Sequence, residues 1–101
     1  MAKLKWSQKS AEDLELIHDY IANDSPFYAR VQIERIFKGV ERLRDFPQSG
    51  RSLPEFPLLP YRELIIGSYR CIYRFDAISG IIMMVTVVHG SLLLKDEMLP
   101  E

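Results

Sequence analysis

The sequence predicts an α+β domain in which an antiparallel helical hairpin packs on one face of a three- to four-stranded antiparallel sheet. Apolar residues recur at helical spacing over residues 8–44, whereas alternating or continuous apolar runs separated by short turns follow over residues 61–89. With 101 residues, 48% of them hydrophobic, the chain has the length and composition of a single globular domain, residues 1–101. The expected element order is β-α-α-β-β-β.

The first half of the chain predicts a short strand followed by two helices. Residues 3–7 alternate polar and apolar side chains, as a half-buried strand does. Ser7 or Ser10 can cap a first helix that ends at Asn23-Asp24. Ser25-Pro26 starts a second helix, because Ser is a good N-cap and Pro fits the first helical position. The expected buried stripes are Ala11, Leu14, Ile17 and Ile21, then Ala29, Ile33, Ile36, Phe37, Val40 and Leu43.

The two helices are expected to pack as an antiparallel pair, because only about two residues join them. Gly39 interrupts the second helical pattern, where Gly costs about 1 kcal/mol relative to Ala. We expect it to allow a close approach of the first helix. Residues 46–60 then carry Pro47, Pro54, Pro57 and Pro60, which predict an extended connector that joins neither a helix nor a ladder.

The rest of the chain predicts strands at residues 61–66, 69–76 and 81–89, with Gly67-Ser68 as a two-residue hairpin turn between the first two. The last of these is nearly continuous in apolar residues, which indicates a central strand covered on both faces. Residues 91–99 predict a short terminal helix or strand. On residues 69–76, one face is expected to carry Tyr69, Cys71, Tyr73 and Phe75, and the other Arg70, Ile72 and Arg74.

Composition narrows the class of protein. Thirteen Lys and Arg against fourteen Asp and Glu give a net charge of −1, which excludes non-specific coating of nucleic acid. Cys71 is the only cysteine, so no intramolecular disulfide forms and a reducing compartment fits best. The longest apolar run, residues 81–85, is far short of the roughly 20 residues of a membrane helix. The sequence predicts a cytoplasmic protein without a membrane partner.

Metal and cofactor chemistry find little support. His18 and His89 are the only histidines, and neither lies at ligand spacing from Cys71 or from the other. The sequence has no glycine-rich phosphate loop and no nucleophile-elbow motif. We therefore expect no metal and no cofactor, and we expect Cys71 to be a small buried hydrophobe.

The informative cluster is positively charged. Arg62, Arg70 and Arg74 come from two strands that are expected to pair, and Arg70 and Arg74 share a face of theirs. Convergent guanidinium groups suit phosphate or carboxylate recognition. Surface ion pairs with Glu63, Asp76 and the helix acids are an equally weighted interpretation. His89, at the end of the neighbouring strand, is either structural or a general acid or base.

Several short motifs together resemble the RelE/ParE superfamily of bacterial type II toxin–antitoxin systems, over about residues 3–94. The resemblance implies a small toxin that a cognate antitoxin binds and neutralises. The Phe-Pro-x-x-Gly ending of the second helix and the Tyr-Arg-Glu-Leu strand are more similar to ParE than to RelE. The motifs are Ala11-Glu12-Asp13-Leu14, Phe46-Pro47-Gln48-Ser49-Gly50-Arg51, Tyr61-Arg62-Glu63-Leu64, Tyr69-Arg70 and Val87-Val88-His89-Gly90.

Two activities are common in this superfamily. ParE-like members lack a nuclease set and poison DNA gyrase, and this is the leading expectation. RelE-like members cut mRNA in the ribosome as metal-independent endoribonucleases. In that alternative, Arg62 or Arg70 would stabilise the phosphate, His89 would transfer a proton and Glu63 would act as the base.

One departure from the family pattern disfavours the nuclease. Many relatives carry an Arg shortly after the His-Gly pair, whereas Ser91-Leu92-Leu93-Leu94 follows His89-Gly90 here. The chain is therefore expected not to be an enzyme, and a degenerate, non-toxic relative is a third reading.

Partner contacts can be assigned on the same basis. Arg62, Arg70 and Arg74 are the expected target-binding residues, with gyrase, or else the ribosome and its mRNA, as the target. Leu92, Leu93 and Leu94 are the expected antitoxin-binding residues of a hetero-oligomer, because a small monomer seldom exposes such an apolar patch. The alternative, that these leucines complete the core, carries equal weight.

Overall fold

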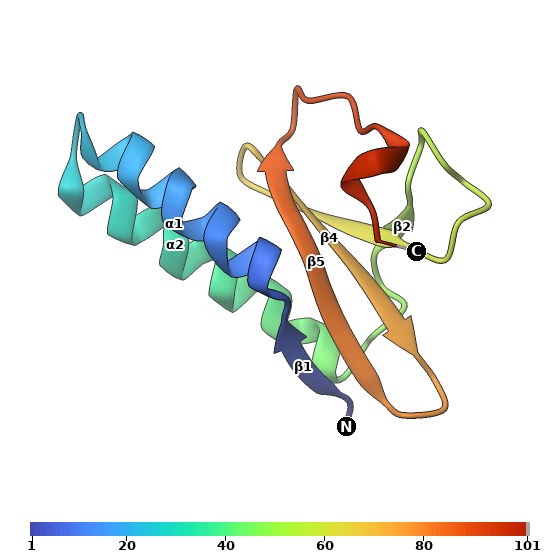
Figure 1. The fold of residues 1–101 in the computed structure, drawn as a ribbon. Coiled ribbons are helices and arrows are strands. Elements are labelled where there is room, and N and C mark those ends of the chain that lie inside the picture. Colours follow the sequence, from blue (N-terminus) through green and yellow to red (C-terminus); the bar gives the residue numbers. More distant parts are fainter. Residues whose placement is uncertain (101) are drawn as a thin grey trace.

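Five strands form one sheet, and two helices lie across one of its faces (Figure 1). The structure, a computed structural model, describes residues 1–100. Within that range no helix combines the length and the apolar character needed to cross a bilayer. The elements are β1 (Lys3–Trp6), α1 (Gln8–Ala22), α2 (Pro26–Glu41), the 3-10 turn η1 (Arg42–Arg44), β2 (Arg51–Ser52), β3 (Arg62–Ile66), β4 (Tyr69–Asp76), β5 (Ile81–His89) and the 3-10 turn η2 (Asp96–Met98).

Local side-chain chemistry sets the ends of both helices. Ser7 caps α1, and its Oγ accepts a hydrogen bond from the Ser10 N–H at 3.1 Å. Ser25 caps α2 in the same way, with Pro26 as the first helical residue. These contacts satisfy backbone donors that have no partner within the helix. The predicted helical hairpin and its starting points are confirmed.

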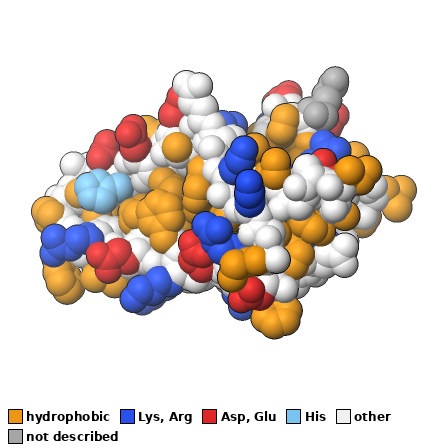
Figure 2. Space-filling view, turned by 90° about the horizontal axis from the view of Figure 1, so that it is seen from below, with side chains coloured by type: hydrophobic (Ala, Val, Ile, Leu, Met, Phe, Trp, Pro, Cys, Tyr) orange, Lys and Arg blue, Asp and Glu red, His pale blue; other side chains and the backbone are white. Residues whose placement is uncertain are grey.

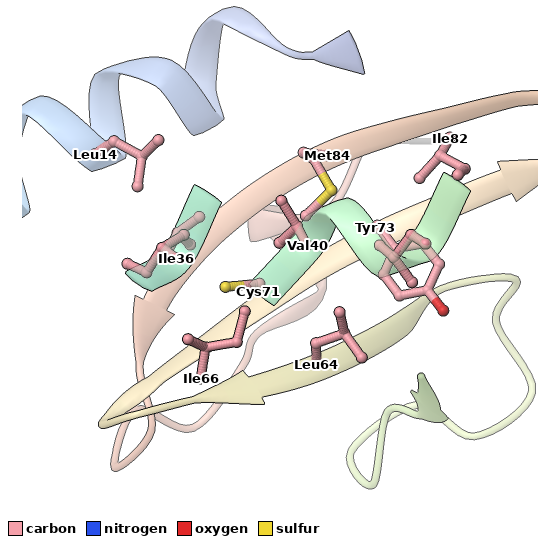
Figure 3. Close-up of a cluster of buried hydrophobic side chains, with 11 residues drawn as sticks. Leu14, Ile36, Val40, Leu64, Ile66, Cys71, Tyr73, Ile82 and Met84 are labelled. Atoms are coloured by element: carbon pink, nitrogen blue, oxygen red, sulfur yellow. The ribbon is translucent and has the colours of Figure 1, made fainter. Parts of the chain in front are cut away.

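One apolar cluster fills the space between the helices and the sheet (Figure 3). Cys71 and Tyr73 of β4 point into it, which confirms the predicted inner face of that strand. In α1 only Leu14 of the predicted stripe is fully buried. Ile17 and Ile21 are half-buried, because the far end of the hairpin projects beyond the sheet (Figure 1), and the expectation that Ala11 is buried was wrong, since it is exposed. Phe37 of α2 is also partly exposed. The buried members are Leu14, Ile36, Val40, Leu43, Leu64, Ile66, Cys71, Tyr73, Ile82, Met84 and Val87.

A second apolar cluster lies on the opposite face of the sheet. There the C-terminal segment, residues 91–100, and the connector cover β4 and β5 (Figure 1). The prediction that the strand at residues 81–89 is covered on both faces is confirmed. In place of the predicted terminal helix or strand, residues 91–100 contain only the short 3-10 turn η2. The buried members of this cluster are Leu53, Tyr61, Ile72, Val85, Leu94 and Leu99.

The sheet differs from the prediction in being mixed and in having five strands. Its order is β1-β5-β4-β3-β2, and β1 runs parallel to β5, with Lys3 opposite Ile81 and Trp6 opposite Met84. The remaining pairs are antiparallel, as expected for β3–β4 and β4–β5, and the unpredicted β2–β3 pair is antiparallel as well. Alternating polarity identifies a strand but not the direction of its partner, so the sequence pattern left this pairing undetermined.

The connector also departs from the prediction, because part of it pairs with the sheet. Arg51 and Ser52 form β2, opposite Glu63 and Arg62 of β3. The pair lies between Pro47 and Pro54 and keeps its own N–H groups, so the prolines do not prevent it from joining the ladder. The expectation that this stretch excludes ladder pairing was wrong at these two residues.

Gly39 permits a close approach, but not to the predicted partner. A Cβ at this position would lie 2.5 Å from Cδ1 of Ile66 on β3. Gly39 therefore lets α2 settle onto the sheet. The expectation that it serves contact with the first helix was wrong.

A β-bulge in β5 ties the sheet to α1. Ile72 pairs with Thr86 but Tyr73 pairs with Met84, which leaves Val85 without a partner on β4. Asp13 of α1 accepts hydrogen bonds from Thr86 Oγ1 at 2.5 Å and from the Val87 N–H at 3.1 Å. The bulge thus obtains from α1 the polar contacts that the ladder does not supply.

Candidate functional site

Arg70 is the centre of a buried ionic cluster on the face of the sheet opposite the helices. Its Nε donates to Glu63 Oε1 at 2.7 Å, while Nη1 and Nη2 donate to the two Glu55 oxygens at 2.7 and 2.8 Å. Nη1 also donates to the Leu92 carbonyl at 3.1 Å. All three guanidinium nitrogens donate hydrogen bonds within the molecule, and only 5% of Arg70 is exposed. Its positive charge is therefore paired inside the protein.

The charges of this cluster balance. Glu63 is buried, and it pairs with Arg51 Nε at 2.6 Å as well as with Arg70. The hydrogen bonds from Arg70 hold the pKa of Glu55 at about 2, well below its ordinary value. The hydrogen bonds that Arg70 donates to Glu55 in turn raise the pKa of Arg70. The cluster is a paired structural network, and the Glu55 carboxylate, with its lowered pKa, is a poor proton acceptor near neutral pH.

Arg62 lies on the other face of the sheet. It stands opposite Tyr73 of β4 and shares its side of β3 with Leu64 and Ile66, which face the helices. Its Nη1 donates to the Gly50 carbonyl at 2.8 Å, and the Gly50 N–H donates to the Tyr73 hydroxyl at 2.9 Å. Arg62 therefore helps to fasten the connector at the edge of the sheet.

Arg74 and His89 are the exposed members of the predicted set. Arg74 shares its face of β4 with Arg70 and Ile72, toward the end of the strand. His89 ends β5 on the helix side, where its ring makes an edge contact with Tyr69 at 5.7 Å between ring centres. Its Nδ1 lies 2.7 Å from Ser91 Oγ. His89 also borders a hollow of about 370 Å³ beside Ile17 of α1.

The predicted nuclease residues therefore do not converge. Glu63 and Arg70 lie on one face, whereas Arg62 and His89 lie on the other. Even the latter two are far apart, since the residues opposite them on β4, Tyr73 and Tyr69, are about 14 Å apart at roughly 3.4 Å per residue. A general acid or base must reach the reacting atom within hydrogen-bond distance, so this arrangement gives no shared centre for phosphate and proton chemistry.

The three predicted antitoxin-binding leucines have different environments. Leu93 is 70% exposed and Leu92 is 39% exposed, whereas Leu94 is 3% exposed and anchored in the second apolar cluster. Leu92 and Leu93 line a groove of about 540 Å³ together with Ile65 and Pro54. Leu94 thus completes the core, whereas Leu92 and Leu93 remain accessible at the surface.

Residues 1–100 hold no group of three metal-ligating side chains. Burial raises the pKa of the Cys71 thiol to about 12, so the thiol is protonated and unreactive near neutral pH. Sequence reasoning predicted this burial from the alternation of β4.

Sequence reasoning missed two features, the pairing of Glu55 with Arg70 and an apolar hollow beside the helices. Glu55 lies in the connector, where no periodic pattern signals which face a residue takes. The other is an apolar hollow of about 350 Å³ where β1 meets the two helices, lined by Trp6, Leu14, Ile33 and Phe37 and bordered by His18. Trp6 and Phe37 contact edge to face there, at 5.2 Å between ring centres. Figure 2 shows apolar side chains gathered between charged ones on one face of the molecule.

Solved structures define the class of this fold. The chain is similar to a toxin–antitoxin structure described as the chromosomal ParDE system from P. aeruginosa, with 24% identity, 88% and 96% of the two chains covered and a TM-score of 0.73. It is also similar to the RelBE2 toxin–antitoxin complex from Mycobacterium tuberculosis, with 20% identity, 87% and 96% covered and a TM-score of 0.60. The chain therefore shares its fold with chains in both structures.

Sequence comparison places the chain within the RelE/ParE superfamily. Residues 4–93 match the model of the family described as the ParE toxin of the type II toxin–antitoxin system parDE. A curated relative, Toxin RelE2 of Caulobacter vibrioides, is 28% identical over 91 residues, which cover 90% of this chain and 98% of the relative. The chain belongs to the ParE toxin family, and the predicted superfamily is confirmed.

Proposed function

We propose that this chain is a toxin that a cognate antitoxin neutralises in the cytoplasm, and that it arrests growth by inhibiting DNA gyrase rather than by cutting RNA. The observation that carries the proposal is the separation of Arg62 and His89 from Arg70 and Glu63 on opposite faces of the sheet. The match to the ParE family model over residues 4–93 supports the same target.

The Arg70 cluster adds a second argument. A nuclease stabilises the charge that develops on phosphate, and it needs guanidinium groups free to face that charge. Arg70 already meets two carboxylates and a carbonyl within hydrogen-bond distance. An inhibitor that works by binding needs no such free group.

We assign the target contacts among the predicted arginines accordingly. Arg74 is exposed and Arg62 is half-buried, so both can meet a partner surface. Arg70 does not contact the target in this proposal. It acts as a positioning residue, because its hydrogen bonds hold the connector and the C-terminal segment in place. The Arg74→Ala variant should weaken inhibition while leaving stability unchanged, and a loss of fold in this variant would contradict the assignment.

The antitoxin surface is proposed to include Leu92 and Leu93. The similar ParDE and RelBE2 structures are of toxin–antitoxin systems, and we infer a partner of the same kind here. Exposed leucines beside Ile65 give that partner an apolar contact, because burying such side chains releases about 1.5–3 kcal/mol each. Leu94 supports this surface from below.

Copurification tests the antitoxin surface. The Leu93→Asp variant should lose most of its capture by tagged antitoxin encoded beside this chain, with an unchanged circular dichroism spectrum. Ile78→Asp is the matched control, since Ile78 is 99% exposed on the β4–β5 turn, away from the C-terminal segment. Equal capture of both variants would remove Leu93 from the interface.

Induction of the chain in a bacterium without antitoxin tests the function itself. We expect growth arrest accompanied by gyrase-dependent DNA breaks, with translation intact in the first minutes. Growth without arrest would identify the degenerate, non-toxic relative and overturn the proposal.

One observation favours the second candidate, a ribosome-dependent mRNA endoribonuclease. The curated relative carries the name RelE2 and matches nearly the whole chain. Early loss of translation with cut messages, abolished by Arg62→Ala or His89→Ala, would support this candidate against the first. Intact messages in arrested cells would exclude it.

A further inference from the structure

The C-terminal segment, residues 91–100, crosses the sheet without joining it. From the end of β5 it turns back over the face opposite the helices (Figure 1). Leu94 and Leu99 anchor it in the second apolar cluster, against Tyr61, Ile72 and Val85. The only regular structure in this segment is the short turn η2. The apolar contacts of Leu94 and Leu99 therefore supply much of what holds this segment to the sheet.

The backbone bonds of this segment are local. The Leu92 N–H donates to the His89 carbonyl at 3.0 Å, and the Leu99 N–H donates to the Asp96 carbonyl at 3.1 Å. Apart from the Leu92–His89 bond, at the turn where the segment leaves β5, no backbone–backbone hydrogen bond within residues 1–100 joins this segment to a strand. A segment that is held over the sheet by side-chain contacts, with no ladder bonds of its own, can open without breaking the ladder beneath it.

Side chains of the sheet and the connector supply the polar attachments. The Leu94 N–H donates to Glu55 Oε2 at 2.9 Å, and Arg70 Nη1 donates to the Leu92 carbonyl. The Tyr61 hydroxyl donates to the Pro100 carbonyl at the far end. These bonds connect the segment to β4, through Arg70, and to two points of the stretch between β2 and β3, through Glu55 and Tyr61.

Glu55 joins these attachments into one unit. Its carboxylate receives two hydrogen bonds from Arg70 and one from the Leu94 N–H. It therefore ties the connector, β4 and the C-terminal segment together at one point. Without it, Arg70 would keep Glu63, but the Leu94 N–H would lose its acceptor.

We propose that residues 91–100 form a strap over the open face of the sheet, that Glu55 is its latch, and that loss of the latch lets the strap lift as a unit. While it is closed, the strap covers Ile72, Val85 and the guanidinium of Arg70. A partner reaches this face only after the strap lifts. The strap thus masks the protein's own apolar surface, whichever target the toxin inhibits.

Hydrogen exchange of the full chain, read by mass spectrometry, tests the latch. In the Glu55→Gln variant, amides of residues 91–100 should exchange about tenfold faster or more, because the hydrogen bonds that Arg70 and the Leu94 N–H donate to this carboxylate weaken when its charge is removed. Helix and β5 amides should keep their wild-type rates. Glu97→Gln is the matched control, since Glu97 is exposed on the same segment and its loss changes the charge equally. Unchanged exchange in the strap, or an equal rise throughout the chain, would overturn the proposal.

The wild-type protein provides a test that needs no variant. Strap amides should exchange through a local opening whose rate is independent of low denaturant concentrations, whereas core amides should follow global unfolding. Strap amides with the same denaturant dependence as the helices would show that the segment does not lift separately. This outcome would contradict the strap even if Glu55→Gln fails to fold.

Discussion

Arg62 and Arg70 lie on opposite faces of the sheet, although they stand on neighbouring antiparallel strands. Arg62 faces the helix side beside Tyr73, and Arg70 faces the connector and the C-terminal segment. Two arginines so placed cannot grip one phosphate. This separation is the main structural reason for proposing a toxin that acts by binding.

The same separation predicts different effects of removing each arginine. Arg70→Ala leaves Glu55 without an ion-pair partner and Glu63 with Arg51 alone, in a largely buried cluster, and should lower the free energy of unfolding by about 3–5 kcal/mol. Arg62→Ala loses one bond to a carbonyl and should cost about 1 kcal/mol. Urea unfolding measures both, with exposed Arg74→Ala as the control, expected within about 0.5 kcal/mol of wild type. Equal losses for Arg62 and Arg70 would contradict the described cluster.

Stability should fall in acid through Glu55. Its pKa in the folded protein is about 2 and is higher in the unfolded chain, so the unfolded state binds the proton first as the pH falls. The contribution of Glu55 is therefore fully present above about pH 5 and is lost between about pH 5 and pH 2. Unfolding measured across this window should show a smaller loss in Glu55→Gln than in wild type. Identical pH profiles would show that Glu55 is not paired as described.

Gly39→Ala tests the contact between α2 and the sheet. A new Cβ would meet Ile66 Cδ1 at 2.5 Å, and overpacking of this kind outweighs the helix propensity gained. We expect a net loss of about 1–2 kcal/mol. The double variant with Ile66→Val removes the clashing carbon, so it should be more stable than the sum of the two single losses. If the losses of stability of the two single variants simply add, Gly39 does not lie against Ile66 as described.

Asp13→Ala tests the link between α1 and the bulge of β5. It removes the acceptor of the Val87 N–H and of the Thr86 hydroxyl, both in a buried part of the strand. The expected loss is about 1–3 kcal/mol of the free energy of unfolding. Glu12→Ala is the control, because Glu12 is exposed and should change stability by about 0.5 kcal/mol or less. A loss no larger than that of Glu12→Ala would show that the bulge does not depend on Asp13.

The parts of the fold predicted from the sequence are those that local chemistry determines. Ser7, Ser25 and Pro26 signalled the helix starts, and the alternation of β4 signalled which of its side chains enter the core. Partner direction in the sheet is a long-range property, so the parallel pairing of β1 with β5 was not predictable from the pattern. The same holds for β2, which forms in a proline-rich stretch.

The site was predicted less well than the fold, although one signal for it was present. The two-residue turn at Gly67-Ser68 places Ile66 opposite Tyr69, which sets Arg62 opposite Tyr73 and therefore on the apolar face. Counting along the hairpin would have separated Arg62 from Arg70. The pairing of Glu55 with Arg70 had no such signal, because it depends on the path of an irregular connector. Exposure of Leu93 and burial of its neighbour Leu94 likewise needed the structure.

Purified toxin, freed from its antitoxin and added to gyrase with relaxed plasmid, tests the central claim most directly. We expect loss of supercoiling together with cleaved plasmid that remains trapped on gyrase, and the effect should disappear when antitoxin is added back. Full supercoiling at a large excess of toxin over gyrase, with cut mRNA when ribosomes are supplied instead, would contradict the account.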